Sequence, residues 1–124
     1  MSRSALVFVA SLLICGSAVA AAPGPDRSQL SYDENVLINT ACAGVRVKGD
    51  GPYYDCITKQ VAALQAHPSP DRSGITPAAN RAIEDRCQHL RRAGVAVYND
   101  CVAQARGRLL ELGSLAAEPV SGAR

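Results

Sequence analysis

This chain contains two copies of one sequence repeat, with a period of 45 residues. Residues 23–67 (repeat 1) align without a gap on residues 68–112 (repeat 2), and 14 of the 45 aligned positions are identical. The rarest matches are the string Pro-x-Pro-Asp-Arg-Ser and one Cys-x13-Cys pair in each copy. A fixed period of this length is typical of tandem supersecondary units. The 124-residue chain is therefore expected to form two similar small units, and it is too short for a large enzyme fold.

Repeat 1 predicts a helical hairpin, with helices over residues 32–48 and 52–66. Ser31 and Glu34 have the spacing of a capping box, which starts a helix. Apolar residues then recur at helical spacing along both segments. The segment between the two predicted helices contains two glycines, which favour a break, and Pro52 suits the first position of the helix that follows.

Repeat 2 predicts a second hairpin, with helices over residues 77–93 and 96–112. Thr76 is placed to cap the first of these helices, and Pro77 suits its first position. We expect Gly113 to end the last helix and residues 113–124 to form a disordered tail. Because no segment alternates apolar and polar residues, we predict an all-α fold of two tandem αα-hairpins.

Each predicted hairpin carries two cysteines, one on each helix, at similar distances from the turn. The four are Cys42, Cys56, Cys87 and Cys101. This symmetry places the two sulfurs of one hairpin opposite each other, so we predict the disulfides Cys42–Cys56 and Cys87–Cys101. A zinc site usually has ligand pairs two to four residues apart, and no C-x-x-C redox motif is present. We therefore expect no metal and no cofactor.

The first 22 residues have the pattern of a secretory signal peptide. Arg3 supplies the positive start, residues 5–14 are apolar, and the Ala-Val-Ala of residues 18–20 is a cleavage signal. The apolar run is too short to span a membrane. We expect the mature chain to begin near residues 21–23, to contain no membrane span, and to be periplasmic or secreted.

The two histidines are candidate catalytic residues by type alone. His67 lies in a linker beside proline, and His89 follows a cysteine by two residues. Neither belongs to a carboxylate motif or a Gly-rich nucleophile turn, so we expect surface histidines and no catalytic site. Tyr53 and Tyr98 each precede a cysteine by three residues, and we expect their rings to pack in the core beside the disulfides.

The duplicated Pro-Asp-Arg-Ser string predicts turn chemistry. Asp26 and Asp71 are expected to bond local backbone amides, as aspartate commonly does in turns. Asn35 and Asn80 fall in the first turns of predicted helices, where local hydrogen bonds suit them.

Charge and aromatic content give little reason to expect nucleic acid as a partner. The net charge is +2 and only 4% of residues are aromatic. Repeat 2 is more basic than repeat 1, and six of its arginines are candidates for a surface that binds an acidic partner. They are Arg81, Arg86, Arg91, Arg92, Arg106 and Arg108. The interspersed Glu84, Asp85 and Asp100 favour the alternative, an ordinary solvated helix face.

The pattern also resembles a repeat of exported bacterial proteins that has no known function. The residues that carry the resemblance are the segment Ile38–Cys42, the run from Gly51 to Cys56, Gln60 and Leu64. Repeat 2 departs from it, since Ala96-Val97 replaces Gly51-Pro52 and Ala105 replaces Gln60. The resemblance implies a bacterial envelope protein and transfers no catalytic residue. We therefore expect a non-enzymatic protein-binding module of the cell envelope, with an unidentified protein as its partner. The alternative is a secreted inhibitor of a lytic or proteolytic enzyme.

Overall fold

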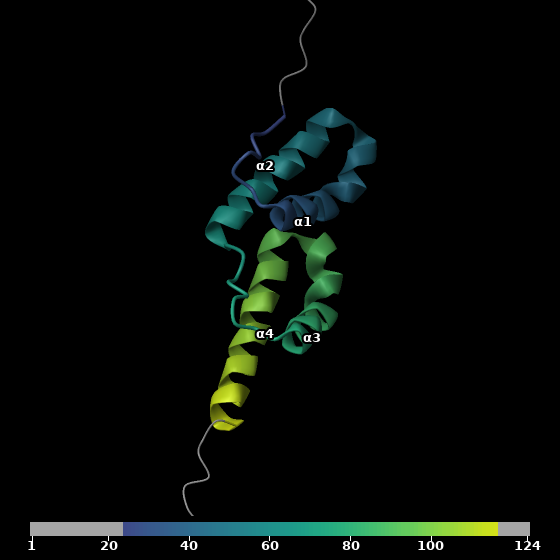
Figure 1. Ribbon diagram of the computed structural model, residues 1–124. Helices are drawn as coiled ribbons and strands as arrows, with labels where there is room; N and C mark the ends of the chain where they lie inside the picture. Colours follow the sequence, from purple (N-terminus) through teal and green to yellow (C-terminus); the bar gives the residue numbers. More distant parts are fainter. Residues whose placement is uncertain (1–23, 117–124) are drawn as a thin grey trace, which may run out of the picture.

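The computed structural model describes residues 24–116 and contains four α-helices and no strand in that part of the chain (Figure 1). The helices are α1 (Tyr32–Cys42), α2 (Asp50–Ala66), α3 (Pro77–Cys87) and α4 (Val95–Ala116). Two 3-10 helices, η1 (Ala43–Lys48) and η2 (Gln88–Ala93), extend α1 and α3 toward the following turns. The predicted all-α fold of two helical hairpins is confirmed.

Local hydrogen bonds explain where the first helix of each hairpin begins. The Ser31 side chain accepts from the Glu34 amide, and Glu34 accepts in return from the Ser31 amide, which completes the predicted capping box. Thr76 caps α3 by accepting from the amide of Ala79. In the preceding turns, Asp26 and Asp71 accept from backbone amides two residues ahead, as predicted.

A single glycine makes the turn inside each hairpin. Gly49 has a φ angle of 108° and Gly94 one of 124°, a region that side chains with a Cβ rarely adopt. Because one glycine is enough to change the chain direction, α2 begins at Asp50 and α4 at Val95. Both helices thus start slightly earlier than predicted.

The predicted end of the last helix is wrong. α4 continues through Gly113 to Ala116, so residues 113–116 are helical and do not belong to a tail. A glycine in an exposed helix costs only about 1 kcal/mol relative to alanine, and the helix can therefore pass through it. The remaining tail residues 117–124 and the predicted signal peptide, residues 1–22, lie outside the described residues.

One disulfide joins the two helices of each hairpin. Cys42 is bonded to Cys56 and Cys87 to Cys101, and both pairs have Cα atoms 5.8 Å apart. The pairing within each repeat is the one predicted from the spacing. Cys42 and Cys87 are completely buried in the core that the two hairpins share.

The two hairpins stack through a surface of repeat 1 that we call the stacking face. It includes Leu37 of α1, Gln60 of α2 and His67 just after α2. The Gln60 side-chain oxygen accepts from the Val95 amide at 2.8 Å, at the start of α4. The His67 carbonyl oxygen accepts from the Asn99 side chain at 2.8 Å. Figure 1 shows the hairpins stacked, with α1 lying near the start of α4.

Candidate functional site

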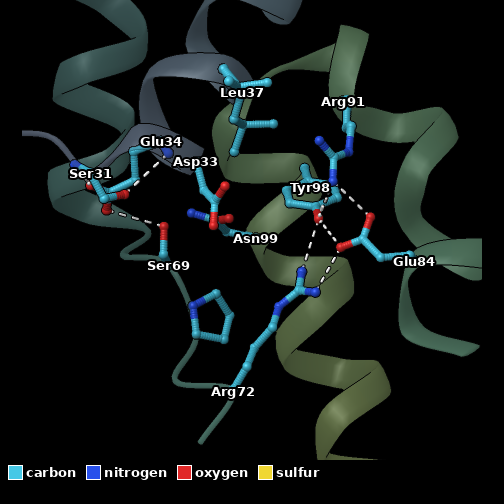
Figure 2. A pocket seen from close by; sticks show the side chains of 12 residues that line it. Ser31, Asp33, Glu34, Leu37, Ser69, Arg72, Glu84, Arg91, Tyr98 and Asn99 are labelled. Carbon is cyan, nitrogen blue, oxygen red and sulfur yellow. Dashed lines mark hydrogen bonds and ion pairs between the residues drawn. The ribbon is translucent and has the colours of Figure 1, made fainter. Parts of the chain in front are cut away.

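A cluster of four polar side chains holds repeat 2 together. Tyr98 of α4 donates from its hydroxyl to Glu84 of α3 at 2.6 Å. Arg72, in the linker before α3, donates to Glu84 at 2.7 Å and to the Tyr98 hydroxyl at 2.9 Å. Arg91 of η2 approaches from the other side and donates to Glu84 at 2.7 Å and to Tyr98 at 3.2 Å. In Figure 2 the two guanidinium groups converge on Tyr98 and Glu84. We call these residues the polar cluster.

The electrostatics of the polar cluster keep its carboxylate ionised. Burial alone would raise the pKa of Glu84, but hydrogen bonds from Tyr98, Arg91 and Arg72 outweigh it and lower this pKa to about 2. Burial, together with the hydrogen bond to Glu84, raises the pKa of the Tyr98 phenol. A carboxylic acid with a pKa near 2 and a neutral phenol are poor proton carriers at neutral pH. The polar cluster is therefore suited to holding elements in place.

Repeat 1 carries a weaker version of the same cluster. Asn39 stands 45 residues before Glu84 and accepts from Arg27 at 2.7 and 2.9 Å and from the Tyr53 hydroxyl at 3.3 Å. Arg46 lies over the Tyr53 ring at 5.6 Å, as Arg91 lies over Tyr98 at 4.9 Å. The arrangement thus belongs to the repeat itself, and repeat 2 strengthens it with a charge.

A cavity of about 360 Å³ lies between the two repeats, and all four residues of the polar cluster line it. From repeat 1 it is lined by residues around the start of α1, including Asp33 and Leu37. In Figure 2 these two side chains point toward the region of Tyr98 and Asn99. Ser69 in the linker donates to Glu34 at 3.2 Å and so joins the two sides. The lining mixes both signs of charge.

The histidines lie outside this cavity. His67 is partly exposed, and its Nδ1 atom lies 2.9 Å from a carboxylate oxygen of Asp100, across the contact between the repeats. His89 is exposed on η2. Within residues 24–116, no three side chains among histidine, cysteine, aspartate and glutamate are grouped to hold a metal ion.

A second hollow, of about 240 Å³, runs between α3 and α4, and we call it the apolar groove. Its lining residues are Ala82, Ile83, Arg86, Ala105, Arg108, Leu109 and Leu112. Ile83 and Ala105 are buried, whereas Leu112 remains 63% exposed. Both charged side chains that line the groove, Arg86 and Arg108, are basic and exposed. The groove therefore combines apolar side chains with two positive charges.

The arginines that the sequence grouped as a basic surface have separate places. Arg91 is part of the polar cluster, where Glu84 neutralises it. Arg86 and Arg108 line the apolar groove. Arg81 and Arg92 are exposed elsewhere on α3 and η2, and Arg106 is partly buried. The six side chains therefore do not act as one set.

Sequence reasoning did not find the polar cluster, although a signal for it was present. Tyr98 is buried in the core as predicted, but its hydroxyl is the centre of a charged network. The sequence predicts a role in a turn for Arg72, together with the rest of its Pro-Asp-Arg-Ser string. Its identity with Arg27, and that of Arg91 with Arg46, marked both as repeated positions. Only folding brings these two arginines close to Glu84. The equivalent position in repeat 1 is occupied by Asn39.

Comparisons with known proteins give no relative: no family model, no curated protein and no solved structure matches this chain. In the described residues, no helix is both long and apolar enough to cross a membrane.

Proposed function

We propose that this chain is an exported, non-enzymatic protein-binding module of a bacterial cell envelope, periplasmic or secreted, and that it binds its partner through the apolar groove. The observation that carries the proposal is Leu112, 63% exposed beside Leu109 at the edge of a hollow with a buried apolar floor. Exposed apolar side chains gathered at a hollow are typical of interaction sites.

Export is supported by the disulfides together with the signal-peptide pattern of residues 1–22. Disulfides form and persist in oxidising compartments such as the periplasm and the extracellular space. Both bridges join helices of the same hairpin, so each unit can be closed soon after it folds.

A binding role without catalysis is supported by the chemistry of the polar cluster. Its carboxylate has a pKa of about 2 and is held by two guanidinium groups, so it does not exchange protons near neutral pH. Its phenol is committed to the same hydrogen bonds. These groups fix the linker and η2 against α3 and α4, which gives the groove rigid walls.

The proposal is tested by affinity capture from the envelope fraction of the source cells with three baits. They are the wild-type mature chain, Leu112→Asp in the groove, and Val47→Asp as the matched control. Val47 is 89% exposed on η1, so its substitution adds the same charge outside the groove. We expect the wild type and Val47→Asp to retain one common partner, and Leu112→Asp to retain at least about tenfold less of it. The substitution removes an apolar contact side chain and places a competing carboxylate beside the arginines of the groove.

Circular dichroism would check that all three baits are folded. Equal recovery of the partner by Leu112→Asp would contradict binding through the groove. The rigid, disulfide-linked frame also suits the alternative function, inhibition of a lytic or proteolytic enzyme. A captured hydrolase whose activity falls on binding would favour that alternative, and an envelope assembly would favour the main proposal.

A further inference from the structure

The apolar groove occupies the same place in repeat 2 that the stacking face occupies in repeat 1. Leu37, Gln60 and His67 of the stacking face lie toward or bond repeat 2. Shifting their numbers by 45 gives Ala82, Ala105 and Leu112, and all three line the groove. The groove is therefore a second stacking face that no further repeat covers within the described residues.

Repeat 1 shows what covers such a face. η2 and the start of α4 lie against it, with Val95 fully buried and Tyr98 only 5% exposed. Gln60 fixes this helix start by accepting the Val95 amide. The cover over this face thus includes the first turns of a helix that carries an apolar side chain at its beginning.

The groove differs from the stacking face of repeat 1 by two charges. Arg86 and Arg108 replace Ala41 and Ala63, at the same positions in the repeat. Both arginines are exposed and line the groove. A partner that covers this face therefore meets two positive charges where the internal contact has alanines, and carboxylates are their natural counterparts.

We infer that the apolar groove receives the start of an amphipathic helix of another protein, with an apolar side chain over Ala105 and carboxylates facing Arg86 and Arg108. This inference rests on the proposed function and names the chemistry of the partner. Acidic residues in a first helical turn are also stabilised by the helix dipole, so the same carboxylates suit both the groove and the helix that carries them.

A second copy of this chain fits the groove less well. If repeat 1 of a second copy covered the groove as repeat 2 covers the stacking face, Asp50 would take the position that Val95 has in the contact between the repeats. Val95 is buried in that contact. Ala105 would stand in place of Gln60 and could not accept the amide at that helix start. A second copy thus loses an apolar contact and a hydrogen bond that help to join the two repeats.

The test uses the mature, oxidised chain and two short synthetic helical peptides as probes. One peptide has leucine and valine on one face and glutamates flanking that face in its first turns, and its twin has lysine in place of each glutamate. Binding is measured by isothermal titration at low and high salt. We expect the glutamate peptide to bind at least about tenfold tighter than the lysine peptide at low salt, with a smaller ratio at high salt.

The double variant Arg86→Glu/Arg108→Glu should reverse the preference, and Arg86→Lys/Arg108→Lys should keep it. Equal binding of the two peptides, or an unchanged preference in the Glu variant, would overturn the inference while leaving groove-dependent capture of a partner intact. Loss of that capture would instead contradict the proposed function.

The same samples distinguish other occupants of the groove. Sedimentation should show a monomer, and a dimer that Leu112→Asp abolishes would place a second copy in the groove. A chain truncated after Ala116 should bind the glutamate peptide as the full chain does. A marked gain in its affinity would show that the chain's own terminal segment competes for the groove. Either of these two results would overturn the inference.

Discussion

Reduction of both disulfides is expected to unfold this protein under conditions in which the oxidised chain is folded. Each bridge joins cysteines 14 residues apart, Cys42 to Cys56 and Cys87 to Cys101. By restricting the unfolded chain, a loop of this size contributes about 3 kcal/mol. Two such contributions are a large share of the roughly 5–15 kcal/mol that stabilises a typical domain. Urea unfolding followed by circular dichroism, with and without reductant, measures the difference.

Two alanine variants serve as controls for this prediction. One replaces Cys42 and Cys56, and the other replaces Cys87 and Cys101. Because the two loops are equally long, we expect each variant to lose a similar part of the free energy of unfolding. Unchanged stability of the reduced wild type would show that the packing of the helices alone holds the fold.

Glu84→Gln is expected to destabilise the protein by about 2 kcal/mol at pH 7. The substitution leaves two guanidinium groups, of Arg72 and Arg91, facing each other without the carboxylate between them. Lowering the pKa of Glu84 from 4.5 to about 2 corresponds to roughly 3 kcal/mol, which solvent reduces because 30% of the side chain is exposed.

The same substitution should change how stability depends on pH. The pKa of Glu84 is lower in the folded chain than in the unfolded chain, so its contribution is complete above about pH 5 and is lost as the pH falls toward 2. The wild type should lose stability over this range, and Glu84→Gln should lose about 2 kcal/mol less. Urea titrations at several pH values measure both slopes.

Asn39→Ala is the matched control, because Asn39 is the exposed counterpart of Glu84 in repeat 1. We expect it to cost at most about 1 kcal/mol and to leave the pH dependence unchanged. Two results would contradict the stabilising role of the polar cluster. One is a Glu84→Gln variant as stable as the wild type at pH 7, and the other is a variant that loses as much stability as the wild type between pH 5 and pH 2.

The features that the sequence predicted correctly depend on neighbouring residues. Ser31 and Glu34 define a helix start within four positions, and Thr76 with Pro77 does the same for α3. The disulfide pairing follows from the symmetry of the cysteines about a turn, which a single glycine makes in each repeat. One local error, at Gly113, arose because a glycine weakens a helix without having to end it.

The features that the sequence did not reveal depend on distant contacts. Gln60 falls among apolar residues at helical spacing, such as Ile57 and Leu64. Its partner, however, is the amide of Val95, 35 positions away. Arg72 reaches Tyr98 across 26 positions. The groove forms only where α3 packs against α4, because its lining residues, such as Arg86 and Arg108, come from both helices.

The most direct test of the central claim, an exported pair of self-contained disulfide-linked hairpins, is mass spectrometry of the native protein after tryptic digestion without reduction. We predict that the chain begins within residues 21–23, that peptide 28–46 is linked to peptide 49–59, and that peptide 87–91 is linked to peptide 93–106. A link between the two repeats, four free thiols, or retention of residues 1–22 in the native protein would contradict the account.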